Sequence, residues 1–343
     1  MDKVSVLIIY TGGTIGMVHN TETGALQPLN FDQISEQVPE LKKFNLRLDA
    51  ISFESPLDSS DIGPDIWVRL AKIIFDNYQG YDGFVILHGT DTMAYTASAL
   101  SFILNNLTKP VILTGSQLPI GILRTDGKEN LITSIEIAAD KEKGRAIVPE
   151  VCIYFENRLY RGNRTTKINA ENFNAFQSAN YPPLAEVGIK IRYNREHILY
   201  PRNRLELELK TNFDNHIAIL KLFPGMNRAF IDSIIGIEGL KGLILETFGS
   251  GNAPADDWFI RRIRKAIDMG IIVLDITQCY TGSVALGMYE TSRKLSHAGV
   301  IGGFDITTEA ATTKMMYLFG QDLPQDEVRL LLNSCLRGEI TIT

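Results

Sequence analysis

Residues 4–10 read VSVLIIY and lead directly into the turn Thr11-Gly12-Gly13-Thr14. The run does not alternate apolar and polar residues, which is typical of a strand buried on both faces of a parallel sheet. Glycines in the turn that follows let the backbone come close to a ligand. The segment therefore predicts the first strand of a parallel sheet, with a candidate site at the carboxyl end of that strand.

Similar apolar runs recur along the first half of the chain at 83–87, 110–113 and 151–155. Between them lie helical patterns. Apolar residues from Met93 to Leu107 repeat at steps of four and three, which predicts a helix over about 92–107. A second helix is predicted around 66–74. Alternating strands and helices indicate right-handed βαβ units with helices on both faces of the sheet.

Residues 190–215 are densely charged and poorly periodic, so we interpret them as an interdomain connection that could include an edge hairpin. Beyond them, strands are predicted at 217–223, 242–246 and 271–276, and a helix at 260–269. We therefore predict an α/β fold. A larger N-terminal catalytic domain (1–190), with a mostly parallel sheet flanked by helices, is joined by a linker (191–215) to a smaller C-terminal α/β domain (216–343).

The composition excludes several classes of protein. The chain has 343 residues, enough for about two domains, and its net charge of −6 argues against a dedicated nucleic-acid binder. Its three cysteines are widely spaced, so neither a disulfide framework nor a zinc site is expected. The chain has no apolar run of about 18 residues and no recognisable signal peptide. We therefore expect a cytoplasmic protein without a membrane partner.

Two hydroxyl-rich loops, Thr11–Gly16 and His88–Thr92, follow predicted parallel strands, and ligands bind at the carboxyl ends of such strands. Neither loop is a P-loop. Asp91 alone is best interpreted as a helix cap. Together, the two threonines and the acid predict a hydroxyl nucleophile, which needs a base. His88 ends an apolar strand and is expected to be a buried, hydrogen-bonded residue rather than that base.

Lys167 is the alternative base, because a desolvated lysine can accept a proton. It ends the basic run Arg161-Gly162-Asn163-Arg164-Thr165-Thr166-Lys167. Taken alone, that run favours a solvated surface loop over a functional segment.

Several segments together resemble the bacterial-type L-asparaginases, and most closely their cytoplasmic type I subfamily. Two of them, Tyr10–Met17 and His88–Met93, are similar to the family's two signature segments. The likeness continues through Thr114–Gln117, Arg158–Lys167, Gly249–Pro254 and His297–Gly303, and so covers nearly the whole chain.

The resemblance implies a large N-terminal and a smaller C-terminal α/β domain, assembled as a homodimer or homotetramer, with no metal and no cofactor. It also implies the activity, which is hydrolysis of L-asparagine to L-aspartate and ammonia. Thr14 would attack the side-chain amide and form a β-aspartyl ester, while Thr90, Asp91 and Lys167 would handle protons and orient water. Asp91 would also bind the substrate's α-ammonium group.

The same resemblance places the substrate's α-carboxylate at Ser59, flanked by Asp58 and Ser60. One departure concerns a tyrosine that many relatives carry on the loop after the first strand, because Ala25 stands near that position here. Either Tyr10, Lys167 or another residue substitutes for it, or Thr14 is activated through substrate and water.

A second, regulatory asparagine site occurs in some type I relatives, and Thr166, Glu246 and Cys279 match its positions. Glu246 stands where the regulated members have arginine, so the site is expected to lose its anchor for an α-carboxylate.

Other functions remain open at this stage. They are a broader asparaginase/glutaminase amidase and a non-catalytic amino-acid-binding sensor. The amidase half of a tRNA amidotransferase is less favoured, because no extension precedes the catalytic segment.

Overall fold

The first strand, β1 (Ser5–Gly12), lies inside an eight-stranded sheet. The sheet order is β15 (Ile191–Tyr193), β14 (Ala185–Val187), β11 (Arg158–Arg161), β10 (Val151–Phe155), β7 (Val111–Thr114), β5 (Gly83–Leu87), β1 and β4 (Arg47–Leu57). The strands from β4 to β10 pair in parallel, whereas β11, β14 and β15 add antiparallel strands at one edge. The predicted mostly parallel sheet is thus confirmed.

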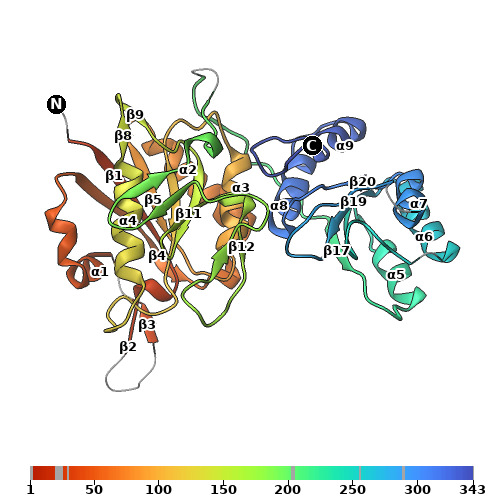
Figure 1. Ribbon diagram of the computed structural model, residues 1–343, viewed down its shortest axis with the longest axis horizontal. Coiled ribbons are helices and arrows are strands. Elements are labelled where there is room, and N and C mark those ends of the chain that lie inside the picture. Colours follow the sequence, from red (N-terminus) through yellow and green to blue (C-terminus); the bar gives the residue numbers. More distant parts are fainter. Residues whose placement is uncertain are drawn as a thin grey trace. The chain divides into compact units, whose positions relative to one another are not determined.

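The structure is a computed structural model that describes residues 3–19, 26–28, 31–201, 205–254, 256–287 and 290–342. The chain divides into two units, residues 1–210 and 211–343 (Figure 1). The eight-stranded sheet belongs to the first unit.

Helices cover the sheet because its strands are apolar on both faces. Val6 and Ile8 of β1 pack in one cluster with residues of α4 (Gly127–Ala139) and with Ile34 of α1 (Phe31–Gln37). The α3 helix (Met93–Ile103) contacts β7, β10 and the α2 helix (Pro64–Asn77). The α3 helix is shorter than predicted, because Leu104 and Asn105 leave it to form β6, which pairs with β16 (Glu208–Leu209).

The remaining short elements of the first unit connect the larger ones. Two-stranded pairs join β2 (Met17–His19) to β3 (Leu26–Pro28), β8 (Lys141–Glu142) to β9 (Arg145–Ala146), and β12 (Thr166–Lys167) to β13 (Phe176–Gln177). Short 3-10 turns are η1 (Thr14–Gly16), η2 (Pro39–Lys43), η3 (Ser59–Asp61), η4 (Gly162–Arg164) and η5 (Arg195–His197). Within the charged stretch 191–215, β15 forms an edge hairpin with β14.

The second unit has a smaller sheet of four parallel strands. They are β17 (Ile217–Lys221), β18 (Gly242–Thr247), β19 (Ile272–Thr277) and β20 (Ile301–Gly302). One core cluster joins this sheet to α5 (Arg228–Ile235), α6 (Asp257–Asp268) and α7 (Glu290–Ala298). The α8 helix (Thr308–Phe319) contacts β17 and β18, and α9 (Gln325–Leu332) packs on α8. The predicted smaller α/β domain is confirmed.

Candidate active site

The turns after β1 and β5 lie side by side, because the two strands are parallel neighbours in which Tyr10 pairs with Leu87. A Cβ atom built on Gly13 would lie 2.5 Å from the Cα atom of Gly89. The backbone of Gly13 also has a φ of 87°, a conformation that residues other than glycine rarely adopt. Glycine is therefore required where the two turns meet.

The turn after β4 lies beside the turns that follow β1 and β5, at the carboxyl ends of the parallel strands. A Cβ atom on Gly89 would lie 2.6 Å from Ser59 Oγ, and the Thr92 hydroxyl donates to the Ser59 carbonyl over 2.6 Å. Asp58 accepts hydrogen bonds from the backbone N–H and the hydroxyl of Ser60. The Ser60 N–H, followed by its hydroxyl, lowers the pKa of Asp58. Ser59 is buried against Gly89, while Asp58 and Ser60 are exposed and bond to each other.

Lys167 connects the candidate residues of two distant segments. Its Nζ donates to Thr90 Oγ1 over 2.7 Å and to Asp91 Oδ1 over 2.6 Å. The Lys167 side chain is 16% exposed, whereas that of Asp91 is 70% exposed. Asp91 therefore takes a lysine partner, and no capping bond forms from the N-cap residue Thr92 of α3. The interpretation of Asp91 as a simple helix cap is wrong.

The basic run before Lys167 is buried, which corrects the expectation of a solvated loop. Arg161 and Arg164 are each only 2% exposed. The Nε of Arg161 donates to Glu150 over 2.6 Å, and both guanidinium groups lie over the ring of Tyr181. Buried charges need such partners. This packing anchors the segment that carries Lys167.

Thr90 has a second partner that sequence reasoning missed. Its hydroxyl lies 3.2 Å from Oε1 of Gln117, which follows β7. The Gln117 N–H donates to both carboxylate oxygens of Asp126, at 3.1 and 3.0 Å. The available signal was position, since Thr90 and Gln117 follow the neighbouring parallel strands β5 and β7.

Thr14 begins the η1 turn and is half-buried. Within the described part of the chain, no hydrogen bond occupies its hydroxyl. By contrast, the neighbouring Thr11 hydroxyl donates to the Leu87 carbonyl over 3.0 Å. Ala25, at the predicted position of the missing tyrosine, lies outside the described residues.

Tyr10 is a poor replacement for that tyrosine as a base. Burial raises its pKa to about 12, and its hydroxyl donates to the Gly16 carbonyl over 3.3 Å. A phenol with that pKa stays protonated near neutral pH.

His88 is fully buried and hydrogen-bonded on both nitrogens, as predicted. Its Nδ1 lies 2.6 Å from the Gly89 carbonyl and its Nε2 lies 2.9 Å from Thr96 Oγ1. Burial lowers its pKa to about 4, so the ring is neutral at physiological pH.

The three positions predicted for regulation fall in both units. Thr166 lies in β12 of the first unit, whereas Glu246 ends β18 and Cys279 follows β19 in the second. Glu246 is buried and accepts the hydroxyl proton of Thr308 over 2.8 Å, with Lys221 Nζ 3.5 Å away. The exposed Cys279 donates its N–H to the Thr277 hydroxyl.

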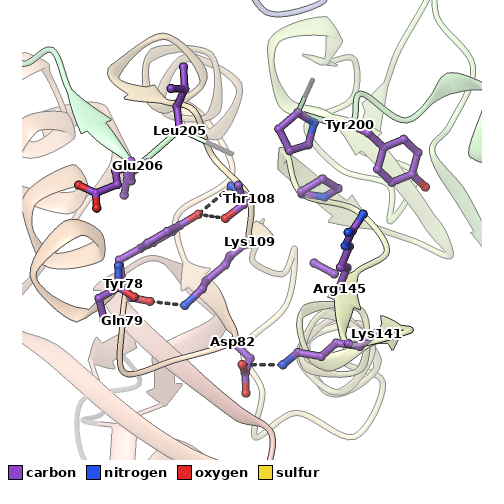
Figure 2. A pocket seen from close by; sticks show the side chains of 15 residues that line it. Tyr78, Gln79, Asp82, Thr108, Lys109, Lys141, Arg145, Tyr200, Leu205 and Glu206 are labelled. Atoms are coloured by element: carbon purple, nitrogen blue, oxygen red, sulfur yellow. Dashed lines mark hydrogen bonds and ion pairs between the residues drawn. The ribbon is translucent and has the colours of Figure 1, made fainter. Parts of the chain in front are cut away.

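A separate cavity of about 500 Å³, whose lining side chains are drawn in Figure 2, lies near the amino ends of β5 and β7, away from the turns that follow these strands. Asp82 and Lys109, which line it, precede β5 and β7. The figure shows Lys141 bonded to Asp82, and Thr108 bonded to Tyr78. The hydroxyl of Thr108 is thus occupied, and this cavity is a weaker candidate for nucleophilic chemistry.

Two features are absent from the described residues. No group of three or more His, Cys, Asp or Glu residues is placed to hold a metal ion there. No helix in that part of the chain has the length and apolar character needed to cross a membrane.

Comparisons with known proteins agree with this geometry. The sequence model of the family "Asparaginase, N-terminal" matches residues 5–199, and that of the family "Glutaminase/Asparaginase C-terminal domain" matches residues 216–332. The chain is 43% identical over 346 residues to L-asparaginase 1 of Escherichia coli K12, with 99% of each chain covered. It matches the structure of L-asparaginase I from Vibrio cholerae O1 biovar eltor with a TM-score of 0.89, 39% identity and complete coverage of both chains. The thermostable L-asparaginase from Thermococcus kodakarensis gives a TM-score of 0.90 and 32% identity, over 99% of this chain and 100% of that one. Because the two models together span most of the sequence and the match to relatives runs end to end, the chain belongs to the asparaginase family.

Proposed function

We propose that this protein hydrolyses L-asparagine to L-aspartate and ammonia, with Thr14 as the nucleophile. The observation that carries the proposal is the Lys167 ammonium, which bonds both Thr90 and Asp91 beside the glycine-rich turn that holds Thr14. The similarity to L-asparaginase 1 of Escherichia coli supports the choice of substrate.

In the proposed acylation, Thr14 Oγ attacks the side-chain amide carbon. The Thr14 proton is passed to the leaving nitrogen, the C–N bond breaks, and ammonia departs. A β-aspartyl ester remains on Thr14. Backbone N–H groups around Gly13, Gly89 and Thr90 are the candidate donors to the oxyanion that develops on the amide oxygen.

In the proposed deacylation, water attacks the ester carbon and the bond to Thr14 Oγ breaks, so that Thr14 regains its proton and aspartate is released. Lys167 and Thr90 lie within hydrogen-bond distance of each other and can orient this water and move its proton. Splitting hydrolysis in this way replaces one difficult step by two easier ones.

Substrate binding is assigned to the groups around this cluster. The exposed carboxylate of Asp91 would bind the α-ammonium group, since only its Oδ1 is engaged by Lys167 among the described residues. The buried Ser59, with Asp58 and Ser60 on either side, would receive the α-carboxylate. This proposed reaction needs no cofactor and no metal. We further propose a cytoplasmic homodimer or homotetramer.

The test is ammonia release from purified protein with asparagine, run beside glutamine. Glutamine is one methylene longer, and a pocket rejects a methylene by only about 1–3 kcal/mol, so a broader amidase would turn over both substrates. A sensor would bind asparagine without releasing ammonia, and that result would overturn the proposal.

A matched pair of variants tests the nucleophile. Thr14→Ala should abolish turnover and ester formation, whereas Thr11→Val, near the end of β1, should retain activity because the Thr11 hydroxyl is already bound to the Leu87 carbonyl. Near-normal turnover by folded Thr14→Ala would refute the assignment of Thr14.

A further inference from the structure

The hydroxyl of Thr90 lies between Lys167 Nζ, at 2.7 Å, and Gln117 Oε1, at 3.2 Å. An ammonium group can only donate hydrogen bonds, so Thr90 accepts from Lys167. The single proton of the Thr90 hydroxyl is then available for Gln117, whose Oε1 can only accept. The direction of both bonds therefore follows from chemistry.

Gln117 is held so that its oxygen faces Thr90. Its Nε2 donates to the carbonyl of Asn172 over 3.1 Å, which settles which end of the carboxamide is the oxygen. Its backbone N–H donates to the carboxylate of Asp126, and the same carboxylate accepts from Leu118 N–H at 3.2 Å and Asn130 Nδ2 at 3.3 Å. Both ends of Gln117 are thus anchored by groups outside the Lys167 cluster.

We propose that Gln117 is a positioning residue, which holds the Thr90 proton so that a Thr90 lone pair faces Lys167. The proposal rests on the proposed function, in which Thr90 and Lys167 move the protons. Gln117 itself acts only through Thr90.

In this arrangement the Thr90 hydroxyl presents only a lone pair to Lys167 Nζ, so it can accept a hydrogen bond from that group but cannot donate one to it. Without the Gln117 acceptor, the Thr90 hydroxyl can rotate and point its proton at Nζ, which only a neutral amine accepts. A carboxylate at position 117 would keep the acceptor and add a negative charge near the ammonium. The two changes should therefore move Lys167 ionisation in opposite directions.

The experiment compares Gln117→Met and Gln117→Glu with the unmodified protein. For Gln117→Met we expect kcat to fall about tenfold, the value of one hydrogen bond, with little change in KM for asparagine. The limb of the kcat pH profile that reports Lys167 ionisation should move to lower pH by about half a unit to one unit in Gln117→Met. The same limb should move to higher pH in Gln117→Glu.

Ser116→Ala is the control for a merely structural role. The Ser116 hydroxyl donates to the Leu118 carbonyl over 2.6 Å, so this change loosens the turn beside Gln117 but leaves both of its anchors, the Asn172 carbonyl and the Asp126 carboxylate, in place. Both limbs of the profile should stay where they are in this variant. Far-UV circular dichroism would verify that each variant is folded.

A second readout does not depend on turnover. The rate at which acetic anhydride labels Lys167, measured by mass spectrometry across pH, reports ionisation of the amine directly. Its midpoint should shift in the same opposite directions in the two Gln117 variants. If both readouts stay fixed, or shift the same way in both variants, this inference is wrong. Absence of asparagine turnover together with opposite labelling shifts would instead overturn only the proposed function.

Discussion

At the scale of single residues, the hydrogen-bond directions around His88 explain why it cannot be the base. Trp67 Nε1 donates to Thr96 Oγ1 over 3.1 Å, so the Thr96 proton is free to go to His88 Nε2. The Nδ1 of His88 faces a carbonyl and must donate to it. The only lone pair of the neutral ring is therefore already used, which leaves Lys167 as the basic side chain in contact with Thr90.

Removing the Lys167 amine tests this conclusion. Lys167→Met should lower kcat by roughly 10²–10⁴-fold, the usual loss when general acid–base help is removed. Steady-state ammonia release measures the effect, with Lys72→Met, an exposed position on α2, as the matched control. A loss below about threefold in folded Lys167→Met would mean that the lysine is only a structural charge.

Glu246 leads to a prediction about regulation. Its buried carboxylate accepts from the Thr308 hydroxyl and lies 3.5 Å from the exposed Lys221 ammonium, and it would repel the α-carboxylate of an effector. Lys241 does not compensate, because it precedes the other end of β18 and pairs with Asp214. A site that cannot hold a ligand cannot shift an equilibrium, so asparagine saturation should be hyperbolic. Initial rates over a wide range of asparagine decide this, and a sigmoidal curve that is lost in Thr166→Ala would contradict it.

At the scale of elements, local pattern located the strands but not their side-chain partners. The runs at 83–87 and 151–155 became β5 and β10 with the predicted bounds. The helix after β5 was predicted too long, because Leu104 continues the apolar spacing yet pairs with β16, about a hundred residues later. Burial of Arg161 was missed for the same reason, since Glu150 lies on a separate segment and no local pattern reports such a partner.

The candidate site likewise has a part that the sequence predicts and a part that it does not. The motifs located Thr14, Thr90, Asp91 and Lys167, and the adjacency of parallel strands explains why their loops meet. The contact between Thr90 and Gln117 depends additionally on which rotamers the two side chains adopt after β5 and β7. Sequence periodicity has no information about that choice.

The turn that carries Thr14 should not tolerate a side chain at Gly13. Gly13→Ala places Cβ against the Gly89 backbone, at a φ of 87°. Strained backbone of this kind costs about 1–3 kcal/mol, and displacement of the turn would also impair turnover. Urea unfolding and ammonia release measure both effects. Gly188→Ala is the matched control, because nothing lies within 4 Å of its Cβ and its φ is outside the left-handed range, and it should change neither quantity. Equal behaviour of the two variants would show that the turns can separate at no cost.

At the scale of the whole molecule, the second unit buries two kinds of ionisable group. Lys314 and Glu339 are both fully buried and form an ion pair 2.7 Å long. In contrast, the side chain of Asp275 has one hydrogen bond within the described part of the chain, from Thr247 Oγ1 at 2.7 Å, and its Oδ2 has no partner among those residues. A paired charge can remain ionised in the interior, whereas an unpaired carboxyl is stable there only when it is protonated.

Asp275 should therefore make folding stability depend on pH. Burial raises its pKa to about 7 from an ordinary value of 3.8, and the Thr247 hydrogen bond opposes that rise only in part. Between these two values the folded chain binds a proton that the unfolded chain has lost, so this group's contribution to stability falls as pH rises from about 4 to 7. Above pH 7 the folded state carries the whole penalty, at most about 4 kcal/mol at 1.36 kcal/mol per pKa unit.

Asp275→Asn mimics the protonated acid, since the amide oxygen can still accept from Thr247. The variant should unfold at higher urea than the unmodified protein at pH 8.5, and the difference should vanish near pH 4. Asp214→Asn should instead unfold at lower urea than the unmodified protein at pH 8.5. Contacts with Lys241 and His216 outweigh the desolvation of Asp214 and lower its pKa to about 2, so its charge stabilises the fold at neutral pH. Urea midpoints from pH 4 to 8.5 measure both effects. Parallel curves for the unmodified protein and Asp275→Asn would mean that Asp275 is ionised in the folded state, with a partner in solution for its second oxygen.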